Sequence, residues 1–211
     1  MGSRGTDASR PLGEPAQKAL EAIGRGEGWL ALRFMFAGVG IDGGVLPHVL
    51  DEALGIGRRW ARELWEPADD VHTNLRRLGV CGVRDMSLME ERAWRVRALF
   101  DPMSSEVLVS KRRLLEMADI QRELGLTLFS PEDLRAVLLA HECFHCLEES
   151  RGERLSELLA QGDPLPAAVR DVGANAFSHA ALGGPPCQAV DVLWLAARAP
   201  RHLDALLAVR L

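Results

Sequence analysis

The chain has 211 residues, enough for one sizeable hydrophobic core or two small ones. Apolar residues make up 47% of it and charged residues 26%, which is ordinary for a soluble globular protein. The net charge of −5 argues against nucleic acid or an anionic membrane as the main partner, and no apolar run reaches the length of a membrane span.

The N-terminal stretch MGSRGTDASRPLGEP is polar and rich in Gly and Pro, without the apolar segment of a secretory signal. We therefore expect residues 1–14 to form a disordered tail and the protein to be cytoplasmic. Four cysteines spread over a chain of this size do not indicate a disulfide framework in such a compartment.

Most of the remaining sequence has the periodicity and cap residues of helices. Ser87 and Glu90 form a capping box, which predicts the start of one helix. The apolar stripe of that helix consists of Ala93, Val96, Leu99 and Phe100. The other expected helices cover about residues 15–23, 29–37, 47–65, 68–78, 112–124, 131–149 and 166–182, and a last one begins near 187 and is interrupted near Pro200.

The best strand candidate is EVLVS at 106–110, which is short, β-prone and bounded by polar residues. The sequence therefore predicts a mainly α protein, of the α+β class, with little sheet. We expect a helical N-terminal region over 15–100 and a second domain over 101–211, or one continuous domain over 15–211.

The helix that begins after Ser130 carries the sequence HECFH at residues 141–145. His141 and His145 lie one helical turn apart, so both imidazoles can bind one zinc ion. Glu142 is rotated by about 100° from His141 and flanks the ion. There it can accept a proton from a metal-bound water, whose pKa zinc lowers to about 7, and pass the proton to a leaving amine. The alternative is a pair of core histidines satisfied by hydrogen bonds, although this helix is apolar on nearly every side.

A catalytic zinc needs a third protein ligand, and the best candidate is Asp171 in RDVGANAFSHAAL. Its helix can run antiparallel to the first, with Ala174 permitting close approach. Asn175, one turn later, is placed to hydrogen-bond a ligand histidine. His179, a further turn on, is an alternative ligand or a donor to the substrate oxygen. The alternatives are an exposed carboxylate for Asp171 and a surface or partly buried histidine for His179.

Two other site types have weaker support. Cys143 and Cys146 form a C-x-x-C within the same helix, but redox and zinc-knuckle pairs usually lie at a loop or a helix start. We expect Cys143 to be buried, while a place near the metal stays open for Cys146. A ferritin-like di-metal site needs a second Glu-x-x-His, which the sequence lacks.

The stretches AHECFHCLEES and DVGANAFSHAALGGPP resemble the small HExxH metallopeptidases of the gluzincin type and are especially similar to the ImmA/IrrE family. In these proteins a later helix has the pattern Glu-x-x-Ala-(Asn/His)-x-Phe, which Ala174, Asn175 and Phe177 match. The resemblance covers about residues 106–186 and implies a zincin-like helical core with a small sheet near the metal, one zinc ion, and a protein or peptide substrate. It also implies that EVLVS is the edge strand that holds an extended peptide, with a plain structural strand as the alternative.

The sequence departs from the family pattern at the third ligand, where Asp171 stands in place of the usual Glu. Its carboxylate is one methylene shorter and must lie roughly 1 Å closer to the metal. The chain also contains no Tyr, a common oxyanion stabiliser in such sites. That task falls to a His or an Arg, with His179 as the first choice.

Besides a zinc metallopeptidase, two functions remain open. One is an inactive zincin-like metal-binding module that acts through a protein partner, and the other is a helical structural protein with a chance motif. Metal content separates the last from the first two. Peptide turnover that Glu142→Gln abolishes separates the enzyme from the inactive module.

Overall fold

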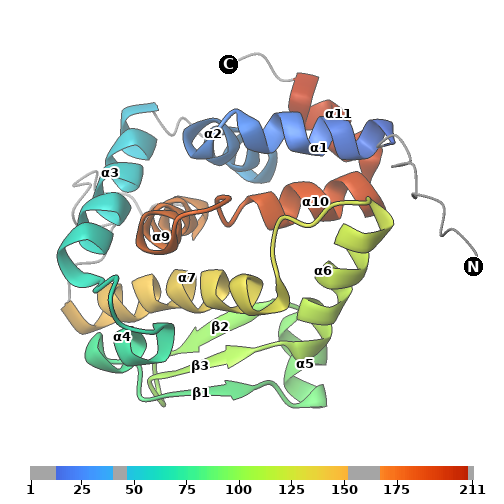
Figure 1. Cartoon of the computed structure of the whole chain (residues 1–211). Coiled ribbons are helices and arrows are strands. Elements are labelled where there is room, and N and C mark those ends of the chain that lie inside the picture. The colour runs from blue at the N-terminus through green and yellow to red at the C-terminus, as the bar shows by residue number, and fades with distance from the viewer. Residues whose placement is uncertain (1–12, 40–46, 152–166, 209–211) are drawn as a thin grey trace, which may run out of the picture.

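The computed structural model describes residues 13–39, 47–151 and 167–208, so nearly all of the expected N-terminal tail lies outside it. These residues form many helices and one small sheet (Figure 1), which confirms the mainly α class. The strands are β1 (Gly82–Asp85), β2 (Ala98–Asp101) and β3 (Glu106–Val109). The helices are α1 (Glu14–Gly24), α2 (Glu27–Val39), α3 (Pro47–Leu64), α4 (Val71–Arg77), α5 (Leu88–Trp94), α6 (Lys111–Glu123), α7 (Pro131–Arg151), α9 (Ala167–Leu182), α10 (Ala189–Arg198) and α11 (Pro200–Ala208).

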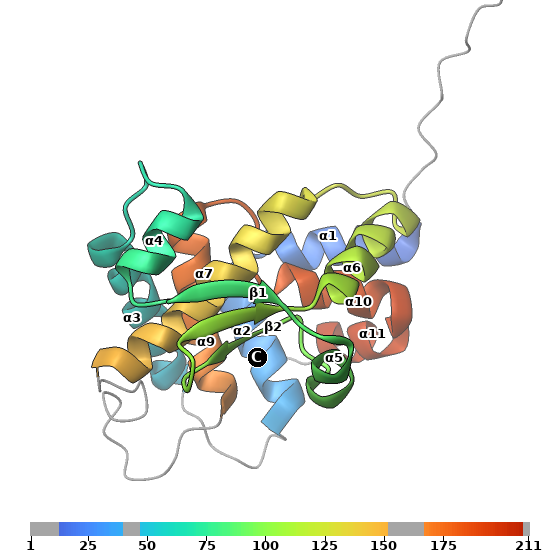
Figure 2. The same ribbon diagram turned by 90° about the horizontal axis from the view of Figure 1, so that it is seen from below.

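The elements are arranged in layers around α7. The sheet lies on one side of α7, while α9 and α10 lie on the other side, covered in turn by α1, α2 and α11 (Figure 1). Seen from below, the sheet lies in front of α7 (Figure 2). One hydrophobic core takes buried residues from nearly every element, from Ala19 of α1 to Leu203 of α11. None of the helices among the described residues is long and apolar enough to cross a membrane.

The sheet has the order β1-β3-β2, so β3 is its central strand and β2 an edge. β1 runs parallel to β3, and β2 runs antiparallel with Phe100 opposite Val107. EVLVS is therefore a strand as expected, but the expectation that it forms the edge was wrong. The free edge that faces α7 belongs to β2.

The helix expected after Ser87, whose apolar stripe reaches Phe100, was also wrong in its second half. The capping box of Ser87 and Glu90 is present, but α5 ends at Trp94, and Arg95 adopts the left-handed conformation with φ 51°. Residues 98–101 then pair with β3, which follows after a short turn and supplies an antiparallel partner. That pairing, which helix propensity does not include, decides the structure of the segment.

Helix α9 packs closely on α3 and α7 through two glycines. A Cβ on Gly57 of α3 would collide with the backbone oxygen of Gly173 and lie 2.9 Å from Cβ of Ala176. A Cβ on Gly173 would lie 2.9 Å from the ring of Phe144 in α7. Ala174 is fully buried, but Gly173 is the small residue whose lack of a side chain brings α9 against α7.

Candidate metal site

Helix α7 carries the HECFH sequence through the middle of the molecule. It begins with a reciprocal cap, in which Asp133 N–H donates to Ser130 Oγ and Ser130 N–H donates to the Asp133 carboxylate, at 3.0 and 3.4 Å. The helix is buried between the sheet and α9, so its polar residues must find partners on these two sides. The two histidines turn toward α9, and Glu142 turns toward β2.

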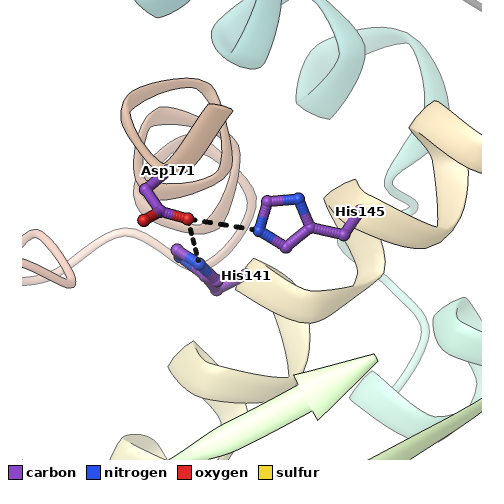
Figure 3. Close-up of side chains that lie close together, drawn as sticks. All are labelled: His141, His145 and Asp171. Carbon is purple, nitrogen blue, oxygen red and sulfur yellow. Dashed lines mark ion pairs between the residues drawn. The ribbon is translucent and has the colours of Figure 1, made fainter. Parts of the chain in front are cut away.

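Asp171 reaches from α9 toward both histidines of α7 (Figure 3). Its Oδ1 lies 3.8 Å from Nε2 of His141 and 3.5 Å from Nε2 of His145. Two ligands about 2.1 Å from a tetrahedral ion lie about 3.4 Å apart, so both distances to Asp171 are close to the spacing of a zinc site. All three ligand atoms lie within 4.8 Å of one another. The close approach of α9 at Gly173 explains how the short side chain of Asp171 reaches both histidines.

The other ring nitrogen of each histidine is held by an acceptor. Nδ1 of His141 lies 2.9 Å from Oδ1 of Asn175, and Nδ1 of His145 lies 2.9 Å from Oε2 of Glu148. Because these oxygens accept hydrogen bonds, each ring carries a proton on Nδ1, and Nε2 faces Asp171. Glu148 is fully buried, accepts a hydrogen bond of 3.1 Å from Nε of Arg170 and forms an ion pair with Nη2 of Arg170 at 2.9 Å. The surrounding residues therefore fix both rings in the tautomer that a metal needs.

The electrostatics of this group favour a cation. Burial lowers the pKa of His141, but the nearby Asp171 carboxylate and Cys187 raise it by more, so its pKa lies well above the usual value. In His145, bonds to Asp171 and Glu148 likewise outweigh burial and raise the pKa. Burial raises the pKa of Asp171, but both histidines lower it to well below its ordinary range. A bound metal would replace any proton on the Nε2 atoms that face Asp171 and take up the same negative charge.

Glu142 lies between the histidines and the edge of the sheet. Only 8% of the residue is exposed, and its Oε2 accepts a hydrogen bond of 2.9 Å from the backbone N–H of Phe100 in β2. That N–H points away from β3, because the residues on either side of Phe100 are the ones whose backbone groups form hydrogen bonds with β3. The free edge of β2 thus holds the Glu142 carboxylate beside the ligand group.

A cavity of about 720 Å³ opens over these residues. The other walls of the cavity are formed by residues 95–97, which precede β2, and by helices α6 and α10. Its lining includes His141, Glu142, His145, Asp171, Asn175, Arg95, Arg97, Leu99, Arg113, Glu116, Cys187, Gln188, Asp191 and Trp194. Two arginines are held by ion pairs, Arg97 to Asp191 and Arg113 to Glu116, each at 2.6 Å. A volume of this size accommodates several residues of an extended peptide.

His179 does not reach this site. It lies on α9 two turns beyond Asp171, where its Nε2 is 3.8 Å from Oε2 of Glu27 in α2, and it does not line the cavity. The expectation of a ligand or substrate donor at His179 is therefore corrected. Helical rotation between Asp171 and His179 carries the second side chain toward α2 instead of α7.

The cysteines of the C-x-x-C also lie away from the ligand group. Cys143 is fully buried, as expected, and its Sγ belongs to the core. Sγ of Cys146 lies 3.8 Å from the backbone oxygen of Leu78, next to α4. Burial raises the pKa of Cys146 to about 11, so the thiol stays protonated. Neither residue serves the site, and all four cysteines are free thiols.

Sequence reasoning missed three contributors to this site. Glu148 had a usable signal, because it follows His145 by three residues on the same helix face. Cys187 and Gln188 follow a Gly/Pro turn far from the motif, and no local pattern marks them. Only the packing of α10 beside α7 and α9 brings them to the cavity.

Compared with protein-family models, with curated proteins and with solved structures, the chain gives no significant match. The geometry of the site therefore carries the functional argument alone.

Proposed function

We propose that the protein is a zinc-dependent metallopeptidase of the HExxH type. The observation that carries the proposal is the convergence of three ligand atoms, from His141, His145 and Asp171, within 4.8 Å of one another and next to Glu142. Two imidazoles and one carboxylate are a donor set that suits zinc and leaves coordination positions free for reactants. The acceptors at the two Nδ1 atoms, Asn175 and Glu148, leave both Nε2 atoms free to bind a metal, which supports this proposal.

The chemistry divides between the metal and the chain. A zinc ion at this site would supply Lewis-acid activation of a water and of a peptide carbonyl. Glu142 would accept the proton of the attacking water and deliver it to the departing amine nitrogen. The hydrogen bond from Phe100 N–H fixes one carboxylate oxygen, and the residue still lines the cavity where that proton transfer occurs. Because the chain has no tyrosine, stabilisation of the oxyanion would fall to Arg97 or Arg113, which both line the same cavity.

The proposed substrate is a protein or peptide in extended conformation. The free edge of β2 borders the cavity at Ala98, whose backbone groups point away from β3 and are available to a strand of substrate. We place this activity in the cytoplasm as part of the same proposal, because free thiols are typical of reducing compartments.

The test combines metal content with turnover. Protein purified without a histidine tag should hold one zinc per chain by elemental analysis, and His145→Ala should lose it. The zinc-loaded protein should cleave peptides from a mixed-sequence library, and Glu142→Gln should abolish cleavage while keeping the zinc. Absence of stoichiometric zinc in the wild type, or equal cleavage by Glu142→Gln, would contradict the proposal.

One observation favours a second function, a metal-binding module that acts through a protein partner. Oε2 of Glu142 is already occupied by the backbone of Phe100, which leaves a single oxygen for proton transfer. Zinc bound at full stoichiometry without any cleavage of the library would select this second function.

A further inference from the structure

Gln188 is a buried amide without partners at the wall of the metal-site cavity. It stands at the start of α10 and lines the cavity together with His141 and Asp171. Only 3% of it is exposed, and neither its amide nitrogen nor its amide oxygen has a hydrogen-bond partner among the described residues. It occupies the N-cap position of α10, yet its side chain makes no capping bond.

The other buried amides in the described part of the chain are all bonded. Gln121 accepts from the N–H groups of Leu128 and Phe129 and donates to the Phe129 carbonyl, at 2.9 to 3.1 Å. Asn74 and Asn175 likewise bond to protein groups. Since buried amides are nearly always paired, an exception on a cavity wall indicates that a ligand supplies the partners.

Two backbone donors lie beside this amide. The N–H groups of Cys187 and Gln188 bond to no described atom, whereas those of residues 189–192 bond to carbonyls of residues 186–188. The N-terminal end of α10 therefore offers free donors and the positive end of the helix dipole. Cys187, which precedes this end of α10, lines the same cavity as His141 and Asp171, so the free donors adjoin the metal ligands.

The balance of donors and charges selects a neutral peptide group over a carboxylate. Asp191, in the first turn of α10, already pairs with Arg97 at 2.6 Å. The carboxylate of a ligand would be repelled by the negative charge of Asp191. A carboxylate would also leave the amide oxygen of Gln188 unpaired, because it has no proton to donate. A peptide group offers a carbonyl to the donors and an N–H to that oxygen, so it satisfies both.

We propose that the N-terminal end of α10 is a subsite for the substrate backbone, where the Gln188 carboxamide pairs with a peptide group next to the metal ligands. This subsite rests on the proposed function in taking a peptide as its occupant. Turning the Gln188 amide toward the cavity breaks no hydrogen bond, because it has none to lose.

The first test asks whether Gln188 is structural. Gln188→Leu should keep the melting temperature of the wild type or raise it, because no bond is lost and an unpaired polar group is removed. Gln121→Leu is the matched control and should melt several degrees lower. A fall for Gln188→Leu as large as that of the control would overturn the subsite.

The second test uses N-acetyl-leucine N-methylamide as a neutral probe and N-acetyl-leucine as its carboxylate counterpart. Both are titrated into zinc-loaded, ¹⁵N-labelled protein, and the Gln188 side-chain NH₂ signals are assigned by their loss in Gln188→Leu. The methylamide should shift these signals saturably, and Gln188→Leu should bind it about tenfold more weakly. No shift, or stronger binding of the carboxylate, would overturn the subsite.

Measurements of peptide cleavage test the peptidase activity separately from the Gln188 subsite. Binding of the methylamide through Gln188 without any peptide cleavage would leave the subsite standing and remove the peptidase. Cleavage with an unchanged KM in Gln188→Leu would keep the peptidase and remove the subsite.

Discussion

The ligand histidines are held by the ring nitrogens that face away from Asp171. The oxygen of Asn175 and the buried carboxylate of Glu148 each accept from an Nδ1 proton, so both Nε2 atoms point into one space. An Nδ1 partner of this kind raises the basicity of the ring and fixes its orientation. In the proposed metal site, Asn175 would therefore influence metal affinity without touching the metal.

The substitution Asn175→Leu tests this role of Asn175 in metal affinity. Loss of the bond to His141 should weaken zinc affinity about 10- to 100-fold, measured by competition with a chromophoric chelator. Ser178→Ala is the control, since this buried residue on the same helix bonds only to the backbone oxygen of Asn175. Equal zinc affinity in Asn175→Leu and the wild type would contradict the assigned role.

The carboxylate of Glu27, which faces His179, is also informative at the residue scale. Both its oxygens are buried without hydrogen bonds, and burial raises its pKa even though Arg58 and His179 act to lower it. A carboxyl whose pKa is raised by folding stabilises the protein below its unfolded pKa of about 4.3, and this stability is lost as pH rises through the folded value.

Glu27→Gln should therefore raise the melting temperature at pH 8 by several degrees and change it little near pH 4. Glu52→Gln, at an exposed position on α3, is the control and should have no such pH-dependent effect. Melting curves recorded across this range decide the matter, and a drop in stability at pH 8 for Glu27→Gln would contradict the account.

At the scale of elements, the sequence predicted what depends on local pattern. The caps at Ser87 and Ser130 and the position of α9 all follow from residues within a few places of one another. The sequence also suggested Asp171 and Asn175, because helical spacing alone sets their face. It failed at β2, whose strand depends on β3, and at the α10 residues of the cavity, whose neighbours are remote in the chain.

The contact of α3 with α9 gives a prediction for two glycines of one helix. Gly57→Ala should destabilise the protein by about 1–3 kcal/mol and weaken zinc binding, because the new methyl group pushes against Gly173 and displaces the helix that carries Asp171. Gly55→Ala meets no atom within 4 Å and should instead stabilise the protein by about 0.5–1 kcal/mol. Urea unfolding measures both values, and equal signs would refute the packing argument.

For the whole molecule, the important fact is that the ligand group joins separate layers of one core. His141 and His145 come from the central helix and Asp171 from the layer above it, so an ion held by all three ties the layers together. Binding to the folded state alone stabilises it by mass action.

Zinc at one hundred times its dissociation constant should therefore add about 2.7 kcal/mol, and raise the melting temperature by roughly 5–11 °C. Calorimetry with and without a chelator measures the effect. Asp171→Ala should lose most of the increase, while the half-exposed Asp204, outside the site, can be changed to Ala as a control. An equal zinc effect in Asp171→Ala would exclude this residue as a ligand.

The cavity also contains an intrinsic optical reporter. The chain has five tryptophans and no tyrosine, so its ultraviolet emission comes from indole rings alone. Of these five, only Trp194 lines the cavity, where its Nε1 donates to Glu116 at 3.4 Å. A molecule that enters the cavity changes the polarity around this one ring, and Trp194→Phe removes that part of the signal. Occupancy of the site can therefore be followed from the emission of the unlabelled protein.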